Sequence, residues 1–370
     1  MSDATIRWWR TDLGDDEIAG VGAAIRGRRV NQGRECDDLE TALARYLGVP
    51  HVVATTSGSV ALLLALKACG VGPGDEVILP ALTFIAPAHA ALWLGASVRL
   101  VDVSSHRAVM DPTQVEHAVT RRTKAVVCVH LNGRAVDVDA IRAASSAAVV
   151  EDCAQALGSR RDSKALGTSG DAGAFSMSIS KLITTGEGGF VATSSADLHR
   201  RLAKLRNHGV ARIADNIFPE IGFNFRLTDL QAAVGRAQLR RVDAKIAALR
   251  SVYRCYREML ADLRFIRLLD LDRPAGEVPL WVEAVCADRD RVVAELARHG
   301  IESKAFHPAL SASPHLQAKG DFPNARRFAS EGIILPSGPD QNLGDLERVG
   351  AALQDIAPLI DGEPTAEPQP

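Results

Sequence analysis

A lysine beside a glycine-rich turn is the first residue of this chain that is equipped for chemistry. Lys181 lies in the segment SMSISKLITTGEGG, whose glycines and threonines favour tight backbone turns over a helix. An amine held at such a turn is suited to form a Schiff base with a carbonyl cofactor. A solvated surface lysine is the alternative interpretation, and this segment alone does not decide between the two.

A second candidate group is a carboxylate at the end of a predicted buried strand. The segment AAVVED ends in Glu151 and Asp152. The carboxyl ends of parallel strands border the ligand crevice of α/β proteins, and a buried acid requires a cationic partner. A protonated pyridine nitrogen would supply that cation for Asp152, while Glu151 would point to the opposite side of the strand. A helix-capping or surface acid pair is the alternative.

The third feature is the segment TTSGSVALLLAL, which predicts a strand, a short turn and an apolar helix. The free amides at such a helix start can bind a phosphate. Gly58 would permit close backbone approach, and Ser59 would add a hydroxyl and a helix cap. An ordinary N-cap is equally compatible with this segment. Neither GxGxxG nor GxxxxGK[ST] occurs, so binding of a dinucleotide or a P-loop nucleotide loses its main support.

Alternating strands and helices must position these three groups. Continuous apolar runs predict strands at 51–55, 76–80, 97–103, 124–130 and 147–152, with helical segments between them. This alternation is typical of an α/β fold with a mostly parallel sheet. Residues 171–178 and 188–194 predict a strand pair near the sheet edge, and the proline-free pattern from Thr228 to residue 260 predicts one long helix bridging two domains.

The remainder of the chain predicts a smaller C-terminal unit with strands at 265–269 and 280–286 and helices at 289–300 and 343–356. We therefore expect an N-terminal arm over residues 1–34, a large cofactor-binding domain over 35–250 and a small α+β domain over 251–360. The acidic, proline-rich residues 361–370 predict a disordered tail.

Composition excludes several classes of protein. The 370 residues carry a net charge of −2 and only 5% aromatic residues, which argues against nucleic acid or an anionic membrane as a partner. No stretch is long and apolar enough for a membrane helix, and the first residues lack a signal-peptide pattern. The six cysteines show no CxxC spacing. We expect reduced thiols in a cytoplasmic protein and no metal site, with a zinc site or disulfides as the minor alternative.

A phosphate-binding helix start, an acid at a strand end and a lysine at a glycine-rich turn are together the anchors that pyridoxal 5′-phosphate requires. In their order and surroundings the chain resembles the DegT/StrS-type aminotransferases, from about Gly33 to Ile356. The segments that carry the resemblance are GRECDDLETALARYLGV, TSGSVALLLALKACGVGPGDEVILPALTFIA, TKAVVCVHLNG, VVEDCAQALGS, SKLITTGEGGF, LRNHG, IGFNFRLTDLQAAVGRAQL and ILPSGP.

The resemblance implies a fold-type-I transferase with a large domain built on a mixed sheet, and a homodimer whose active sites are shared. Lys181 would bind pyridoxal 5′-phosphate covalently, and Asp152 would pair with its ring nitrogen. The other implied cofactor-binding residues are Gly58, Ser59 and Ser176 at the phosphate, Phe84 on the ring face, Gln155 at the ring hydroxyl, and Asn224 at the phosphate of the neighbouring subunit's cofactor. Phe84 as plain core, Gln155 as a capped turn residue and Asn224 as a turn former are the alternatives.

The resemblance also indicates a reaction. It is nearest to the perosamine synthase-like branch, which implies ping-pong transfer of an amino group from L-glutamate to a nucleotide-linked 4-keto-6-deoxyhexose. Arg226 would bind the substrate phosphates and His307 would contact substrate; a dimer salt bridge and a surface histidine are the respective alternatives. Met177 and Ser178 depart from the usual aromatic pattern, which leaves the size of the substrate open.

Two other functions stay open at this point. A cyclitol or amino-hydroxybenzoate aminotransferase of secondary metabolism shares the GEGG pattern. A non-catalytic sensor with the same fold is the alternative from another class. Lys181 argues against the dehydratases of the family, which carry histidine at this position.

Overall fold

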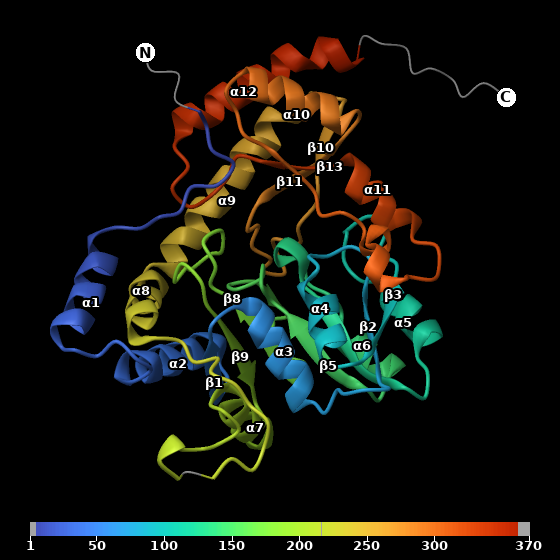
Figure 1. The fold of residues 1–370 in the computed structure, drawn as a ribbon. Coiled ribbons are helices and arrows are strands. Elements are labelled where there is room, and N and C mark those ends of the chain that lie inside the picture. Colours follow the sequence, from blue (N-terminus) through green and yellow to red (C-terminus); the bar gives the residue numbers. More distant parts are fainter. Residues whose placement is uncertain (1–4, 216, 362–370) are drawn as a thin grey trace.

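A seven-stranded sheet forms the centre of the larger part of the molecule (Figure 1). The computed structural model describes residues 5–215 and 217–361. The strand order is β1-β9-β8-β5-β4-β2-β3. The strands are β1 (His51–Thr55), β2 (Glu76–Pro80), β3 (Ser97–Val101), β4 (Thr123–Val129), β5 (Ala148–Asp152), β8 (Ala172–Ser176) and β9 (Gly189–Thr193). Only β9 is antiparallel to its neighbours in this sheet, which confirms the predicted α/β fold.

The predicted strand pair exists and lies near the sheet edge, although neither of its strands is the edge strand itself. β8 and β9 pair antiparallel, with Phe175 and Phe190 stacked at a centroid distance of 4.5 Å. β1 then pairs along the whole of β9, from His51 opposite Thr193 to Thr55 opposite Gly189, and so takes the edge position itself. β1, which precedes the predicted phosphate-binding segment, is therefore hydrogen-bonded to β9, which follows Lys181.

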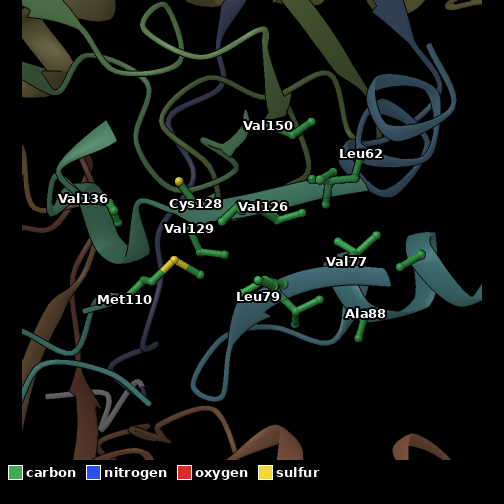
Figure 2. Packing of buried hydrophobic residues seen from close by; sticks show 14 of the residues in the cluster. Leu62, Val77, Leu79, Ala88, Met110, Val126, Cys128, Val129, Val136 and Val150 are labelled. Atoms are coloured by element: carbon green, nitrogen blue, oxygen red, sulfur yellow. The ribbon is translucent and has the colours of Figure 1, made fainter. Parts of the chain in front are cut away.

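The sheet is buried on both faces. On β4, Val126, Val127 and Cys128 are each 0% exposed, as expected for a strand covered by helices on both sides. Figure 2 shows Val77 and Leu79 of β2 close to Val126 and Val129 of β4 within the same hydrophobic cluster. The helices of this part are α1 (Asp15–Arg26), α2 (Arg34–Leu47), α3 (Gly58–Ala68), α4 (Ala86–Trp93), α5 (Pro112–Ala118), α6 (Val138–Ala144), α7 (Ala196–Arg206) and α8 (Asp229–Arg240).

The single long helix predicted from Thr228 to residue 260 is wrong, because the structure has two helices there. α8 ends at Arg240, and α9 (Val242–Met259) begins after Arg241. The Arg241 guanidinium bonds Asp12 and Glu17 of the N-terminal region, at 3.0 and 2.7 Å. This anchor lies at the point where the chain changes direction from one helix to the next. The absence of proline does not guarantee a continuous helix.

A second sheet lies above the first in Figure 1, with α9 in gold running between them. It is antiparallel, in the order β10-β11-β13-β12. Its elements are β10 (Ile266–Leu268), β11 (Val282–Cys286), β12 (Lys304–Ala305), β13 (Gly332–Leu335), α10 (Arg289–Arg298), α11 (Pro323–Glu331) and α12 (Leu343–Asp361). The sequence patterns predict β10 and β11 but miss β12 and β13.

Short elements complete the described chain: the hairpin β6 (Arg160–Arg161) and β7 (Lys164–Ala165), and the 3-10 turns η1 (Leu131–Gly133), η2 (Ile213–Asp215), η3 (Leu310–Ala312) and η4 (Pro314–Leu316). We propose the domain division at residues 250 and 251, which falls within α9. Leu249 packs in the core of the first part and Val252 in that of the second.

The N-terminal segment, residues 5–14, crosses the second sheet before α1 begins. Ile6 bridges to Ile301, and Trp9 bridges to Ser337. Residues 1–4 of the predicted arm and 362–370 of the predicted tail lie outside the described residues. Among the helices that the structure describes, none has the length and apolarity that a membrane span requires.

Candidate functional site

One cavity of about 320 Å³ gathers most of the residues predicted for the site. It lies between the carboxyl ends of β4 and β5, the start of α3 and the loop after β8, where α/β sheets place their ligands. Eight of the ten predicted site residues line it: Gly58, Ser59, Phe84, Asp152, Gln155, Ser176, Lys181 and His307. The other two, Asn224 and Arg226, do not line this cavity.

The start of α3 forms one wall of this cavity. Ser57 is the N-cap, and its side chain accepts the N–H of Val60 at 3.2 Å. The predicted cap at Ser59 is therefore wrong: Ser59 already belongs to the first helical turn, whose amides have no acceptor within the helix. A Cβ at Gly58 would lie 2.7 Å from that of Ser176, so only glycine lets this turn approach the end of β8 so closely.

Asp152 ends β5 and is 4% exposed. Burial raises the pKa of its carboxyl, while the N–H of Ala154 and the charge of Lys181 lower it. Its Oδ1 accepts that N–H at 3.0 Å, and within the described residues Asp152 belongs to no ion pair. A buried carboxylate of this kind requires a cation from elsewhere.

Glu151 points away from the cavity, as the alternation of side chains along a strand predicts. Its carboxylate accepts bonds from His130 Nε2 and from the N–H groups of Gly167, Ser169 and Gly170, at 2.6 to 2.8 Å. The Nδ1 of His130 accepts the N–H of Val136 at 3.0 Å, which leaves Nε2 to donate to Glu151. This acid therefore fixes the loop after the hairpin β6–β7.

Lys181 follows β8 in the turn that the glycines close. Burial lowers the pKa of its amine to about 8; the charge of Asp152 opposes this shift and that of Lys304 adds to it. Lys181 and Asp152 both line this cavity. The Nζ also lies 4.9 Å from the ring centroid of Trp281. The structure thus combines an amine of lowered pKa with a buried carboxylate in one cavity.

Three further predicted residues surround this pair. Gln155 Oε1 accepts the N–H of Asn132 at 2.8 Å, which leaves its Nε2 3.4 Å from His307 Nε2. Phe84 is 54% exposed, so it is not plain core, and its ring lies edge-on to His307 at 5.8 Å. Burial lowers the pKa of His307 to about 4, so its imidazole is neutral at physiological pH. It lines the cavity, so the surface alternative is wrong.

Asn224 and Arg226 lie on an exposed loop, residues 217–227, away from this cavity. Arg226 Nε donates to Asn224 Oδ1 at 2.9 Å, and Asn224 bridges to Asn207. The same loop exposes four large apolar side chains by 60% or more, namely Ile217, Phe218, Ile221 and Phe223. Neither Asn224 nor Arg226 therefore belongs to the group of residues that line the cavity.

Sequence reasoning missed an aromatic wall with a second lysine. Trp8 lies edge-on to Trp281 at 6.1 Å, and Lys304 Nζ lies 4.5 Å from the ring centroid of Trp8. All three residues line the cavity. The adjacent tryptophans at positions 8 and 9 were a possible signal, because the chain has only four tryptophans. Nothing local to the sequence, however, brings positions 8, 281 and 304 together.

Comparison with known proteins agrees with this geometry. Residues 11–354 match the model of the DegT/DnrJ/EryC1/StrS aminotransferase family. The chain is 38% identical to a GDP-perosamine synthase of Caulobacter vibrioides, covering 88% of this chain and 90% of that protein. It is 35% identical to a UDP-N-acetyl-3-dehydro-alpha-D-glucosamine 3-aminotransferase of Acidithiobacillus ferrooxidans, covering 92% and 94%.

Among solved structures, DesV of S. venezuelae in complex with a ketimine intermediate matches with a TM-score of 0.91 and 31% identity, covering 96% of this chain and 99% of that one. DesI in the presence of its TDP-sugar product matches with a TM-score of 0.88 and 31% identity, covering 94% and 92%. Both the sequence and the fold thus point to the same group of enzymes.

Proposed function

This chain belongs to the DegT/DnrJ/EryC1/StrS aminotransferase family and is an aminotransferase, and from that premise we propose that it moves an amino group from L-glutamate to a nucleotide-linked 4-keto-6-deoxyhexose. The relatives named GDP-perosamine synthase support a nucleotide-linked sugar as the acceptor. The observation that carries the proposal is the single cavity that contains Lys181, Asp152 and the start of α3.

The residues of this cavity fit pyridoxal 5′-phosphate, on which the family depends. The first amides of α3 and the Ser176 hydroxyl form a cradle for a phosphate. Asp152 is a buried carboxylate without an ion pair among the described residues, and a protonated ring nitrogen would neutralise it. Gln155 Nε2 is oriented for a ring hydroxyl, and the exposed face of Phe84 is available to the ring.

Each of these residues has a defined task in the proposed reaction. When bound, the coenzyme supplies an aldehyde that reacts with amines and a ring that accepts electron density. Asp152 holds the proton on the ring nitrogen. The Lys181 Nζ removes the proton from the α-carbon of the donor and later delivers a proton to the acceptor carbon, within reach because of its own tether. His307, neutral and in the cavity, is available to hydrogen-bond the acceptor.

Donor and acceptor would occupy this cavity in turn, which gives ping-pong kinetics. We also propose a homodimer, because the 217–227 loop presents Asn224 and Arg226 together with a large apolar surface. Asn224 would then bind the phosphate of the partner's coenzyme, and Arg226 would contact anionic groups of the partner's substrate.

The proposal is tested with 15N-labelled L-glutamate and a panel of ketones. The purified enzyme should transfer the label to a GDP- or dTDP-linked 4-keto-6-deoxyhexose, as measured by mass spectrometry. Lys181→Ala serves as the inactive control. Transfer of the label to cyclitol ketones alone would contradict the nucleotide-sugar assignment but not the aminotransferase activity.

A further inference from the structure

A second cavity, of about 780 Å³, adjoins the cofactor cavity. Its wall is formed by the N-terminal segment, by Ile179, Ser180 and Glu302, and by residues before and within α12. Trp8 and Ser180 line both cavities, so the two meet at these residues. We call the second cavity the outer cavity and the first the inner cavity.

The small volume of the inner cavity limits how much of the substrate it can hold. Ligand cavities usually measure about 300 to 1,000 Å³, so the inner cavity, at about 320 Å³, is at the small end of that range. The coenzyme and the reacting sugar ring would fill it. The rest of a nucleotide-linked substrate would extend outside the inner cavity, and the outer cavity is an adjoining space that shares Trp8 and Ser180 with it.

The outer cavity is lined by two arginines and by three carboxylates, Glu302, Asp340 and Asp345, so it suits a ligand with both anionic and hydrogen-bond-donating groups. Arg7 is exposed there, and no interaction of its side chain occurs among the described residues. Arg10 pairs with Asp340 and Asp345 at 3.3 and 3.5 Å, in ion pairs that stay open to solvent. A nucleotide offers phosphates to the arginines, and sugar hydroxyls and base N–H groups to the carboxylates.

A cation lies where the two cavities meet. Lys304 lines the inner cavity, and its ammonium is held over the face of Trp8 by a cation–π contact of 4.5 Å. Trp8 is itself fixed through its backbone: its N–H donates to Glu302 Oε2 at 3.3 Å and its carbonyl accepts the N–H of Ser337 at 2.8 Å. Lys304 is exposed, and the contact with the ring places its ammonium beside Trp8, which lines both cavities.

We infer that the outer cavity binds the nucleotide of the acceptor, and that Lys304, positioned by Trp8, binds the diphosphate that joins nucleotide and sugar. This inference rests on the proposed function, because it requires a nucleotide-linked substrate. It assigns Lys304 to substrate binding and Trp8 to positioning, and it gives the wide outer cavity a role in choosing the acceptor.

The inference is tested by titrating the holoenzyme with GDP, UDP and dTDP in a calorimeter. Lys304→Met should weaken the binding of the preferred nucleotide by about tenfold or more, because a charge-assisted bond to phosphate is lost. Trp8→Leu should weaken it in the same direction, and Lys304→Arg should restore most of the affinity. Lys164→Met removes an exposed lysine of β7 and is the matched control, with wild-type affinity expected.

A second measurement separates this role from a role towards the amino donor. Lys304→Met should slow the single-turnover reaction with L-glutamate, followed by absorbance at pH 9, far less than it weakens nucleotide binding. Unchanged nucleotide affinity in this variant, or a loss confined to the glutamate reaction, would overturn the inference and leave the proposed function intact. If the wild type reacts with glutamate but binds none of the three nucleotides, the nucleotide-linked acceptor itself is wrong.

Discussion

Two opposite charges share a small buried space in this molecule, and each changes the other's titration. Burial lowers the pKa of Lys181, whereas burial raises that of Asp152. Each residue's charge also favours the charged form of the other. The amine is therefore easier to deprotonate than an exposed lysine, and the carboxylate is poorly compensated until a ring cation arrives. Both features follow from residues that the sequence already singles out.

The lowered pKa of Lys181 predicts how the apoenzyme captures its coenzyme. Only the neutral amine attacks an aldehyde, so the capture rate should rise with pH to a midpoint near 8. Stopped-flow absorbance after mixing apoenzyme with pyridoxal 5′-phosphate measures this. Lys304→Met should move the midpoint to higher pH, because the Lys304 charge helps lower the pKa. A midpoint near 10.5, the ordinary value for a lysine, would contradict the electrostatic account.

The raised pKa of Asp152 predicts opposite effects on stability and activity. A carboxyl whose pKa is higher in the folded state than in the unfolded state loses stability as pH rises through that range. Asp152→Asn removes the charge, so the apoenzyme should be at least as stable as wild type at pH 7, measured by thermal unfolding. Turnover should nevertheless fall by about 100-fold or more, because the ring nitrogen loses its partner. A clearly less stable apoenzyme would show that the carboxylate has a structural role instead.

At the scale of secondary-structure elements, the start of α3 is the boundary that matters most for the proposed phosphate site. The sequence identifies the correct turn but assigns the cap to Ser59, since a serine beside glycine fits either position. The structure shows that the helix begins two residues earlier than that assignment requires, with Ser57 as the cap. Boundaries of this kind depend on how Gly58 packs against Ser176, a contact between distant segments that local patterns do not contain.

Exchange of the two serines tests the role of this element. Ser57→Ala should lower the free energy of unfolding by about 1 kcal/mol, because the amide of Val60 loses its acceptor. Ser59→Ala should leave the stability of the apoenzyme near wild type and weaken coenzyme binding. Chemical denaturation and coenzyme titration of both variants measure these effects. Equal destabilisation by both substitutions would show that the cap is not formed as described.

The same limit of local patterns explains the other errors at this scale. The continuous apolar runs of β2, β4 and β5 suffice to predict buried parallel strands. The break at Arg241 depends on Asp12 and Glu17, more than two hundred residues earlier. β12 has two residues, and it is a strand only because it pairs with β13. Likewise, Trp8 and Lys304 join the site through the path of the N-terminal segment, which no spacing in the sequence reveals.

At the scale of the whole molecule, the single chain holds eight predicted site residues in one cavity and leaves Asn224 and Arg226 on an apolar loop. This distribution is what a site completed by a second copy requires. The sequence alone predicts the residue types of such a site through family resemblance. It does not reveal which of them lie outside the chain's own cavity.

Mixing two inactive variants tests the shared site. Lys181→Ala removes the amine, and Asn224→Asp places a negative charge against the proposed phosphate of the partner. A mixed dimer has one site in which both residues are intact, so subunit exchange should restore activity well above the sum of the separate variants. The absence of any recovery, with subunit exchange verified by differently tagged chains, would contradict the assignment of Asn224 to the partner's site.

The most direct measurement locates the covalent bond between the enzyme and its coenzyme. Reduction of the holoenzyme with borohydride fixes a lysine-bound coenzyme irreversibly, and peptide mass spectrometry then identifies the modified residue. We expect a pyridoxyl group on Lys181 and an unmodified Lys304. Modification of Lys304 or of any lysine outside the inner cavity, or no modification at all, would contradict this expectation.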